Sequence, residues 1–288
     1  MTAQERKNSD PILAGVIGWP ISHSLSPLIH TFWAAQAGVD GYYIPIAAPP
    51  AYDEFVRTME SLRTVGFAGV NVTLPHKEHA LQYADEATQT AKRVGAANML
   101  TFTENGVLAD NSDVTGFSMA LHQAAENIDI SGTALILGAG GAARAIALAV
   151  REAGFSAVEI CNRTQQKAQE IADIFNLTPV PWEERSARLS GATLVVNTTS
   201  LGMSGQPPLQ IDESRLCPGA VVADIVYSPL ETPLLAAPRR RGCAVVDGLS
   251  MLMHQARPGF ATWFGGEGRV NNELRCVLIN ALERQAKQ

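Results

Sequence analysis

The sequence predicts an α/β protein of two domains, an N-terminal one with a mixed, mostly parallel sheet and a second one of alternating parallel strands and helices. Short β-rich runs alternate with helical stretches, which is the pattern of parallel strands covered by helices. The length of 288 residues suggests about two domains. The alternation also restarts after a long expected helix over residues 114–130, and we therefore expect the domain boundary between residues 116 and 131.

The composition argues against several functional classes. The net charge is −6, and 46% of the residues are hydrophobic, which is enough for a sizeable core. No basic tract favours nucleic-acid binding, and no apolar run approaches the ~20 residues that cross a membrane. The first ten residues contain no apolar signal core, and the four cysteines are spread singly, as is typical of reduced thiols. We therefore expect a cytoplasmic protein with a small-molecule ligand, no nucleic-acid partner and no membrane contact.

In the N-terminal half, local signals mark the start and end of each expected element. Ser26 as an N-cap and Pro27 in the first turn predict a helix that runs towards Gly38. Pro75 opens another helix, and the Asn-Gly pair at Asn105 predicts a hairpin and hence one antiparallel edge. The other expected elements are strands over 12–17, 42–46, 69–73, 98–103 and 107–109 and a helix over 51–62.

In the C-terminal half, the expected strands cover 133–137, 157–161, 193–196, 221–225 and 244–246. Between and after them we expect helices over 141–153, 164–175, 249–264 and 271–284. From these patterns alone, the last two helices could complete either domain.

A glycine-rich turn follows the strand over 133–137. In its G-x-G-x-x-A pattern, Gly138 permits a tight turn, Gly140 lets the backbone approach a pyrophosphate, and Ala143 lets the helix pack closely. The helix N-terminus then directs amides at phosphates. A turn that serves packing alone is the alternative, but the strand–helix–strand context favours a dinucleotide.

The end of the next strand indicates which dinucleotide is bound. An acidic residue about 20 positions on would hold the ribose of NAD, but this chain has Asn162, followed by Arg163, Thr164 and Lys167. Polar and cationic side chains suit the 2′-phosphate of NADP. The alternative is that Arg163 and Lys167 are solvated surface charges.

Four polar strings lie at the ends of expected strands in the N-terminal half, where ligands of open α/β sheets bind. They are HSLSP (23–27), NVTLPHK (71–77), GAAN (95–98) and DNSD (110–113). Their hydroxyls, carboxamides, lysine and carboxylate suit a small polyhydroxylated molecule and no metal. The expected capping role accounts for the serine at position 26. No such structural role is expected for Ser24.

Lys77 lies near the start of an expected helix, where the macrodipole disfavours a cation. It is therefore either a surface residue or a functional one, and Asp113 could pair with it and pass a proton beside a hydride transfer. His76 and His79 have the spacing of metal ligands, but no third ligand is evident. We expect both on a solvated helix surface.

With these strings, the chain resembles the shikimate dehydrogenase family over essentially its whole length. The motifs SHSLSP, NVTLPHKE, GAAN, DNSD, LGAGGAAR, NRT, DIVYSPLETP and DGLSMLMHQ occur in the family's order. The resemblance implies a substrate domain over 1–117 and 249–288, an NADP-binding Rossmann domain over 118–248, and an active site in the cleft between them. It also implies reduction of 3-dehydroshikimate with NADPH in the biosynthesis of chorismate and aromatic amino acids, by a monomer or a homodimer.

The resemblance implies a role for each candidate residue, with Lys77 and Asp113 as the catalytic pair. The residues implied for the substrate are Ser24 and Ser26 at the carboxylate, Thr73, Asn98, Asp113 and Gln255 at the ring hydroxyls, and Asn71 and Tyr227 nearby. The residues implied for the cofactor are Gly138, Ala139, Gly140, Gly141, Ala142, Asn162, Arg163, Thr164, Lys167, Ile225 and Gly248.

The chain departs from the family's usual pattern at four positions: Ala97, Met99, Ser112 and Val114. Val114 either trims the substrate pocket or is a neutral choice at a helix start. A paralogue that acts on quinate or an aminated analogue is therefore an alternative, and a non-enzymatic dinucleotide-binding protein is another.

Overall fold

The computed structural model describes residues 10–286, and in it the chain divides into two compact units. The first is formed by the chain up to Ser112 and from Gln255 onwards, and the second runs from Asp113 to His254. Each unit contains one six-stranded sheet with helices against it, so the predicted α/β class is confirmed. One boundary lies at Asp113, the first residue of a helix, and the other lies before Gln255, inside another helix. From the sequence, we expected the boundaries after residues 117 and 248.

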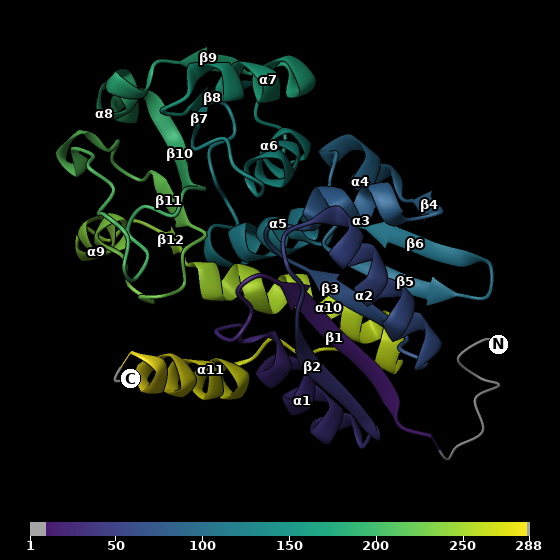
Figure 1. The fold of residues 1–288 in the computed structure, drawn as a ribbon. Helices are drawn as coiled ribbons and strands as arrows, with labels where there is room; N and C mark the ends of the chain where they lie inside the picture. Colours follow the sequence, from purple (N-terminus) through teal and green to yellow (C-terminus); the bar gives the residue numbers. More distant parts are fainter. Residues whose placement is uncertain (1–9, 287–288) are drawn as a thin grey trace. The chain divides into compact units, whose positions relative to one another are not determined.

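The sheet of the first unit is mixed, with the strand order β2-β1-β3-β5-β6-β4 (Figure 1). β1 pairs in parallel with β2 and β3, β5 pairs antiparallel with β3 and β6, and β4 is parallel to β6. The β5–β6 hairpin confirms the Asn-Gly signal, although the edge strand is the unexpected β4. The strands are β1 (Ile12–Gly18), β2 (Gly41–Ala47), β3 (Gly69–Val72), β4 (Glu86–Ala87), β5 (Met99–Thr103) and β6 (Gly106–Asp110).

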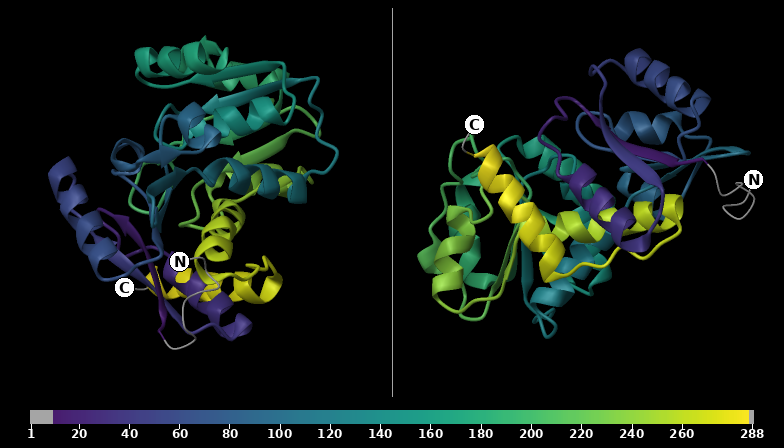
Figure 2. Two further views of the ribbon diagram at one scale, coloured as in Figure 1. Left: turned by 90° about the vertical axis from the view of Figure 1, so that its right-hand side faces the viewer. Right: turned by 90° about the horizontal axis from the view of Figure 1, so that it is seen from below.

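The first unit also contains short and long helices on both faces of its sheet. α1 packs beside α11 (Figures 1 and 2), and α10 continues into this unit from Gln255. The helices are α1 (Ser26–Ala37), α2 (Tyr52–Thr64), α3 (Lys77–Tyr83), α4 (Gln89–Val94), α10 (Gly248–Phe264) and α11 (Asn272–Gln285).

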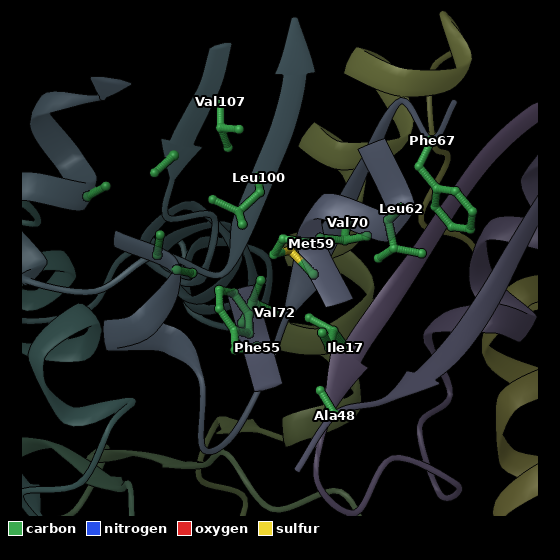
Figure 3. Close-up of a cluster of buried hydrophobic side chains, with 14 residues drawn as sticks. Ile17, Ala48, Phe55, Met59, Leu62, Phe67, Val70, Val72, Leu100 and Val107 are labelled. Atoms are coloured by element: carbon green, nitrogen blue, oxygen red, sulfur yellow. The ribbon is translucent and has the colours of Figure 1, made fainter. Parts of the chain in front are cut away.

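Side-chain alternation in β3 separates a hydrophobic face from a polar site. Val70 and Val72 belong to a buried cluster with Phe55 and Met59 of α2 (Figure 3), and each such large side chain contributes roughly 1.5–3 kcal/mol when fully buried. Because successive strand residues point to opposite faces, Asn71 lies on the other face. The packing of α2 therefore fixes which face of the sheet carries polar groups.

The sheet of the second unit is entirely parallel, in the order β12-β11-β10-β7-β8-β9. The order reverses beside β7, which is the switch point where such sheets bind ligands. Its strands are β7 (Thr133–Leu137), β8 (Ala157–Cys161), β9 (Thr178–Val180), β10 (Ala192–Asn197), β11 (Val221–Asp224) and β12 (Val245–Val246). Its helices are α5 (Asp113–Ala124), α6 (Ala143–Glu152), α7 (Gln165–Phe175), α8 (Arg185–Arg188) and α9 (Pro233–Arg240).

Two expectations about helix ends are wrong. The helix expected to reach Ile130 ends at Ala124, because a polar turn follows in which Asp129 accepts hydrogen bonds from the amide and hydroxyl of Ser131. Ser26 is the first residue of α1 and not its N-cap, which is Leu25. The oxygen of Ser24 accepts the Ser26 amide instead, at 3.3 Å. Among residues 10–286, no helix is long and apolar enough to cross a membrane.

Candidate functional site

In the first unit, Asn98 joins three separate stretches of the chain. It precedes β5 and is buried, with 2% of its surface exposed. Its Oδ1 accepts hydrogen bonds from the amide and hydroxyl of Ser112, at 2.7 and 3.2 Å, and its Nδ2 donates to Gln255 Oε1 at 3.2 Å. The GAAN, DNSD and C-terminal HQ strings therefore meet, the first two at the ends of the neighbouring strands β5 and β6 and the third from within α10.

Asn71 extends this network along β3. Its Nδ2 donates to the carbonyl of Asn98 at 3.1 Å, and its Oδ1 accepts the Tyr43 hydroxyl at 2.7 Å. Burial raises the pKa of Tyr43 well above its usual value, so this hydroxyl stays a proton donor. Tyr43 was not among the candidate residues. In the sequence, Tyr43 lies inside an expected strand beside a second tyrosine, Tyr42. In the structure, Tyr42 is exposed.

The two predicted catalytic residues each begin a helix. Lys77 is the first residue of α3 and half-buried, and its carbonyl accepts the Ala97 amide at 2.8 Å. Asp113 is the first residue of α5 and is buried. A carboxylate there is favoured by the helix dipole, whereas a cation at Lys77 is not. The two residues belong to different units.

The hydroxyl side chains lie beyond the ends of β1 and β3. Ser24 and Thr73 are half-buried, and Ser26 is 5% exposed. Thr73 is anchored because its amide donates to the carbonyl of Ile17 at 2.9 Å. A methyl group on Gly18 would collide with the Thr73 side chain, so the bare glycine lets the two strand ends approach.

The expectation that His76 lies on a solvated helix surface is wrong. The ring is fully buried and stacks on Phe55 with centroids 5.0 Å apart. Its Nε2 lies 3.0 Å from the carbonyl of Ala48, which can only accept, so Nε2 carries the proton and Nδ1 accepts from His79 Nδ1 at 3.1 Å. Burial lowers the pKa of His76. The neutral ring anchors the residue before Lys77. Within the described residues, no three His, Cys, Asp or Glu side chains form a metal site.

In the second unit, the glycine loop has the backbone that the predicted dinucleotide site needs. Gly138 has a φ of 109°, which disfavours any side chain, and a Cβ there would also collide with Thr198 and Thr199. A Cβ at Gly140 would meet nothing within 4 Å, so open space lies against this glycine. The loop leads into α6, where the amide of Ala143 donates to the carbonyl of Gly140 at 3.0 Å and the following first-turn amides have no intrahelical acceptor. These features fit a pyrophosphate.

Asn162, at the end of β8, braces this loop. Its Oδ1 accepts the amide of Ala139 at 3.2 Å, and its Nδ2 donates to the carbonyl of Thr164 at 3.0 Å. One N–H of the amide remains for a ligand. Arg163, Thr164 and Lys167 are exposed, and the Thr164 hydroxyl caps no helix amide. This donor set fits a 2′-phosphate.

The remaining cofactor candidates lie beyond β11 and at the start of α10. Ile225 is half-buried, as is Tyr227, which is a candidate for the substrate and not for the cofactor. A Cβ on Gly248 would collide with the carbonyls of Ile225 and Val226, so the glycine allows these two backbones to touch.

Two buried polar residues near this segment were missed: Asn197 and Asp224, which are 0% and 1% exposed. They end the neighbouring strands β10 and β11 and are partners in the register. Polar side chains at strand ends were the signal used in the N-terminal half. The same signal could have found these two.

Family models and known proteins match the chain. The model for the shikimate dehydrogenase substrate binding domain matches residues 16–100, and that for shikimate / quinate 5-dehydrogenase matches residues 121–204. The NADP(+) shikimate dehydrogenase of Acidiphilium cryptum is 53% identical over 262 residues, which are 91% of this chain and 94% of that protein.

Solved structures have the same fold. Shikimate 5-dehydrogenase of Thermus thermophilus, crystallised with NADP(H) and shikimate, has a TM-score of 0.82 and 35% identity, covering 95% of this chain and 99% of that one. Quinate dehydrogenase of Corynebacterium glutamicum, in complex with NAD, has a TM-score of 0.86 and 29% identity, covering 94% and 99%.

Proposed function

Because this chain belongs to the shikimate dehydrogenase family and is thus an NADP-dependent oxidoreductase, we propose that it catalyses the reversible reduction of 3-dehydroshikimate to shikimate. The observation that carries the proposal is the buried network around Asn98, which gathers amide and hydroxyl groups from three distant stretches. Such groups match the hydroxyls of a polyhydroxylated ring better than an apolar or metal ligand.

In this proposal, most of the residues that bind the substrate belong to the first unit. Ser24 and Ser26 hold its carboxylate, since neutral hydroxyl donors can bind an anion. Thr73, Asn98 and Gln255 bind the ring hydroxyls, together with Asp113. Asn71 and Tyr227 lie near the ring. The Tyr43 and Ser112 contacts hold Asn71 and Asn98 in fixed rotamers, so the substrate meets a preorganised set of groups.

The second unit binds NADP. The loop from Gly138 to Ala142 receives the pyrophosphate, and Asn162, Arg163, Thr164 and Lys167 receive the 2′-phosphate. Ile225 and Gly248 lie against the nicotinamide end. When bound, NADPH supplies the hydride.

Lys77 and Asp113 perform the proton chemistry. As hydride arrives at the C3 ketone, negative charge develops on its oxygen. The Lys77 ammonium stabilises this charge and donates the proton, and in the reverse direction the neutral amine takes it back. Asp113, the other member of the proposed catalytic pair, binds the substrate hydroxyl. Acid–base catalysis of this kind contributes about 10²–10⁴ in rate.

A quinate dehydrogenase is the second candidate, because the similar Corynebacterium protein is one. That protein is in complex with NAD. This chain has Asn162 at the position where an acidic residue would hold the ribose of NAD. An uncharged Asn162 next to the cationic Arg163 therefore favours shikimate with NADP over quinate with NAD.

Initial rates at 340 nm test the proposal, with shikimate and quinate each supplied with NADP+ and with NAD+. We expect activity mainly with shikimate and NADP+. A preference for quinate or for NAD+ would contradict the substrate or the cofactor assignment, and silence in all four assays would contradict the proposed reaction. We propose that the reaction takes place in the cytoplasm, as a step in the biosynthesis of chorismate. We also propose that the protein is a monomer or a homodimer.

A further inference from the structure

In the second unit, a buried pair of side chains joins the ends of two adjacent strands. Asn197 Nδ2 donates to Asp224 Oδ1 at 2.9 Å, and the residues are register partners at the ends of β10 and β11. Neither side chain has been given a role above. Burying a carboxylate or a carboxamide without a hydrogen-bond partner would cost several kcal/mol of folding free energy. Each of these two side chains therefore depends on the partners that it has.

The Asp224 carboxylate holds the segment that follows β11. Its Oδ1 also accepts the Val226 amide at 3.0 Å, and its Oδ2 accepts the Thr232 hydroxyl at 2.7 Å. Thr232 precedes α9 and makes no capping bond to that helix, because its hydroxyl is used here. The carboxylate therefore ties together both ends of the segment 225–231, which carries Ile225 and Tyr227.

Asn197 connects the same pair to the glycine loop. Its Oδ1 accepts the amide and the hydroxyl of Thr199, at 3.0 and 2.7 Å. Thr199 and its neighbour Thr198 are the residues with which a Cβ on Gly138 would collide, and the Thr198 hydroxyl donates to the carbonyl of Gly138 at 3.2 Å. A chain of short contacts thus runs from the glycine loop to the segment after β11.

We propose that Asn197 and Asp224 are positioning residues that set the glycine loop and the segment 225–227 at the spacing that the two ends of NADP require. The proposal rests on the proposed function, which places the pyrophosphate at the first element and the nicotinamide at the second. Gly248 supports it, because its bare Cα packs on the carbonyls of Ile225 and Val226. Neither Asn197 nor Asp224 needs to touch the cofactor for this role.

The charge of Asp224 is not what the role requires. Burial raises the pKa of Asp224 to about 6, although hydrogen bonds from Thr232, Val226 and Asn197 oppose the shift. Asparagine has nearly the same shape. Its Oδ1 can accept from Asn197 and Val226, and its amide can donate to the Thr232 oxygen. Asp224→Asn should therefore preserve the contacts, whereas Asp224→Ala removes all of them.

The experiment compares the NADP+ dissociation constant, measured by calorimetric titration, with the kinetic constants and the melting temperature. For Asp224→Ala we expect the dissociation constant and the KM for NADP+ to rise together by about tenfold or more, as the loss of one or two buried hydrogen bonds would give. The KM for shikimate should change much less. Asp224→Asn should bind NADP+ within about threefold of the parent.

Thr232→Val removes one of the hydrogen bonds to the Asp224 carboxylate. This variant should fold even if Asp224→Ala does not. It should weaken NADP+ binding by an intermediate factor. The matched control is Thr193→Val, because the Thr193 hydroxyl donates to the Asp129 carbonyl at the opposite end of β10. This variant should lower the melting temperature without changing NADP+ binding.

The proposal is overturned if Asp224→Ala or Thr232→Val behaves like the control, with a lower melting temperature and unchanged NADP+ binding. It is also overturned if Asp224→Asn binds as poorly as Asp224→Ala. A parent that binds NADP+ but does not oxidise shikimate would contradict the proposed reaction alone, since the binding comparison still decides the role of the pair.

Discussion

The imidazole of His30 stacks on the phenol ring of Tyr43, with centroids 3.8 Å apart and an angle of 5° between the planes. The Tyr43 hydroxyl in turn donates to Asn71, so the stack lies one hydrogen bond from a candidate substrate residue. Within residues 10–286, both ring nitrogens of His30 are buried without a hydrogen-bond partner. Burial lowers the pKa of His30 to about 3, and the ring is therefore neutral near pH 7.

Acid should destabilise the first unit through His30. In the unfolded chain the imidazole takes up a proton near pH 6.5, whereas in the folded unit it does so only near pH 3. The unfolded state therefore binds more protons between these values, and the stability, which is fully present above pH 6.5, falls as the pH falls. The loss amounts to roughly 3 kcal/mol by pH 4.

Urea titrations at pH 7.5 and pH 4.5 measure this effect, followed by tryptophan fluorescence, since Trp33 and Trp263 lie beside His30. His30→Leu should lose less stability between the two pH values than the parent. His23→Gln is the control, because that side chain is exposed. An equal pH dependence in His30→Leu and the parent would refute the prediction.

Tyr43→Phe should keep the ring stack and remove only the hydroxyl that Asn71 accepts. We expect a loss of about 1 kcal/mol in the free energy of unfolding, together with a higher KM for shikimate, because Asn71 then keeps its bond to the Asn98 carbonyl but loses the one that fixes its Oδ1. Steady-state kinetics and urea titration measure the two effects. Tyr42→Phe is the matched control, since Tyr42 is 58% exposed. An unchanged KM would mean that Asn71 does not depend on Tyr43.

Lys77→Ala should lower kcat by about 10²–10⁴ and leave the KM for shikimate nearly unchanged, because the ammonium acts mainly on charge that develops in the transition state. Lys92→Ala, at an exposed lysine of α4, is the control and should retain activity. Steady-state kinetics at saturating NADP+ make the comparison. A large rise in KM with an intact kcat would transfer Lys77 from catalysis to substrate binding.

Arg163→Ala should weaken the use of NADP+ selectively. A charge-assisted hydrogen bond to phosphate contributes about 1.5–3 kcal/mol, which corresponds to a KM for NADP+ roughly ten- to a hundredfold higher. The residual activity with NAD+ should not fall, since that cofactor has no 2′-phosphate. Arg57→Ala, at an exposed arginine of the first unit, is the control. Equal losses with both cofactors would disprove the 2′-phosphate assignment.

Local sequence patterns were sufficient for most of the fold. The glycine loop, the alternation of strands and helices and the Asn-Gly hairpin depend on backbone conformation and on side-chain periodicity within a few residues. The elements that were missed are short. β4 has two residues, β9 three, α8 four, α4 six and α9 eight, and segments of this length are held by their neighbours rather than by their own propensity.

The residues themselves thus determined the α/β class, the dinucleotide loop and the polar strings at the strand ends. Only the tertiary structure decided which partners those side chains take. His76 looked like a surface residue and is buried, because α2 and the chain beyond β2 provide Phe55 and the Ala48 carbonyl. Asn98 meets Gln255 across 157 positions of sequence, and a contact at such separation leaves no periodic pattern in the chain.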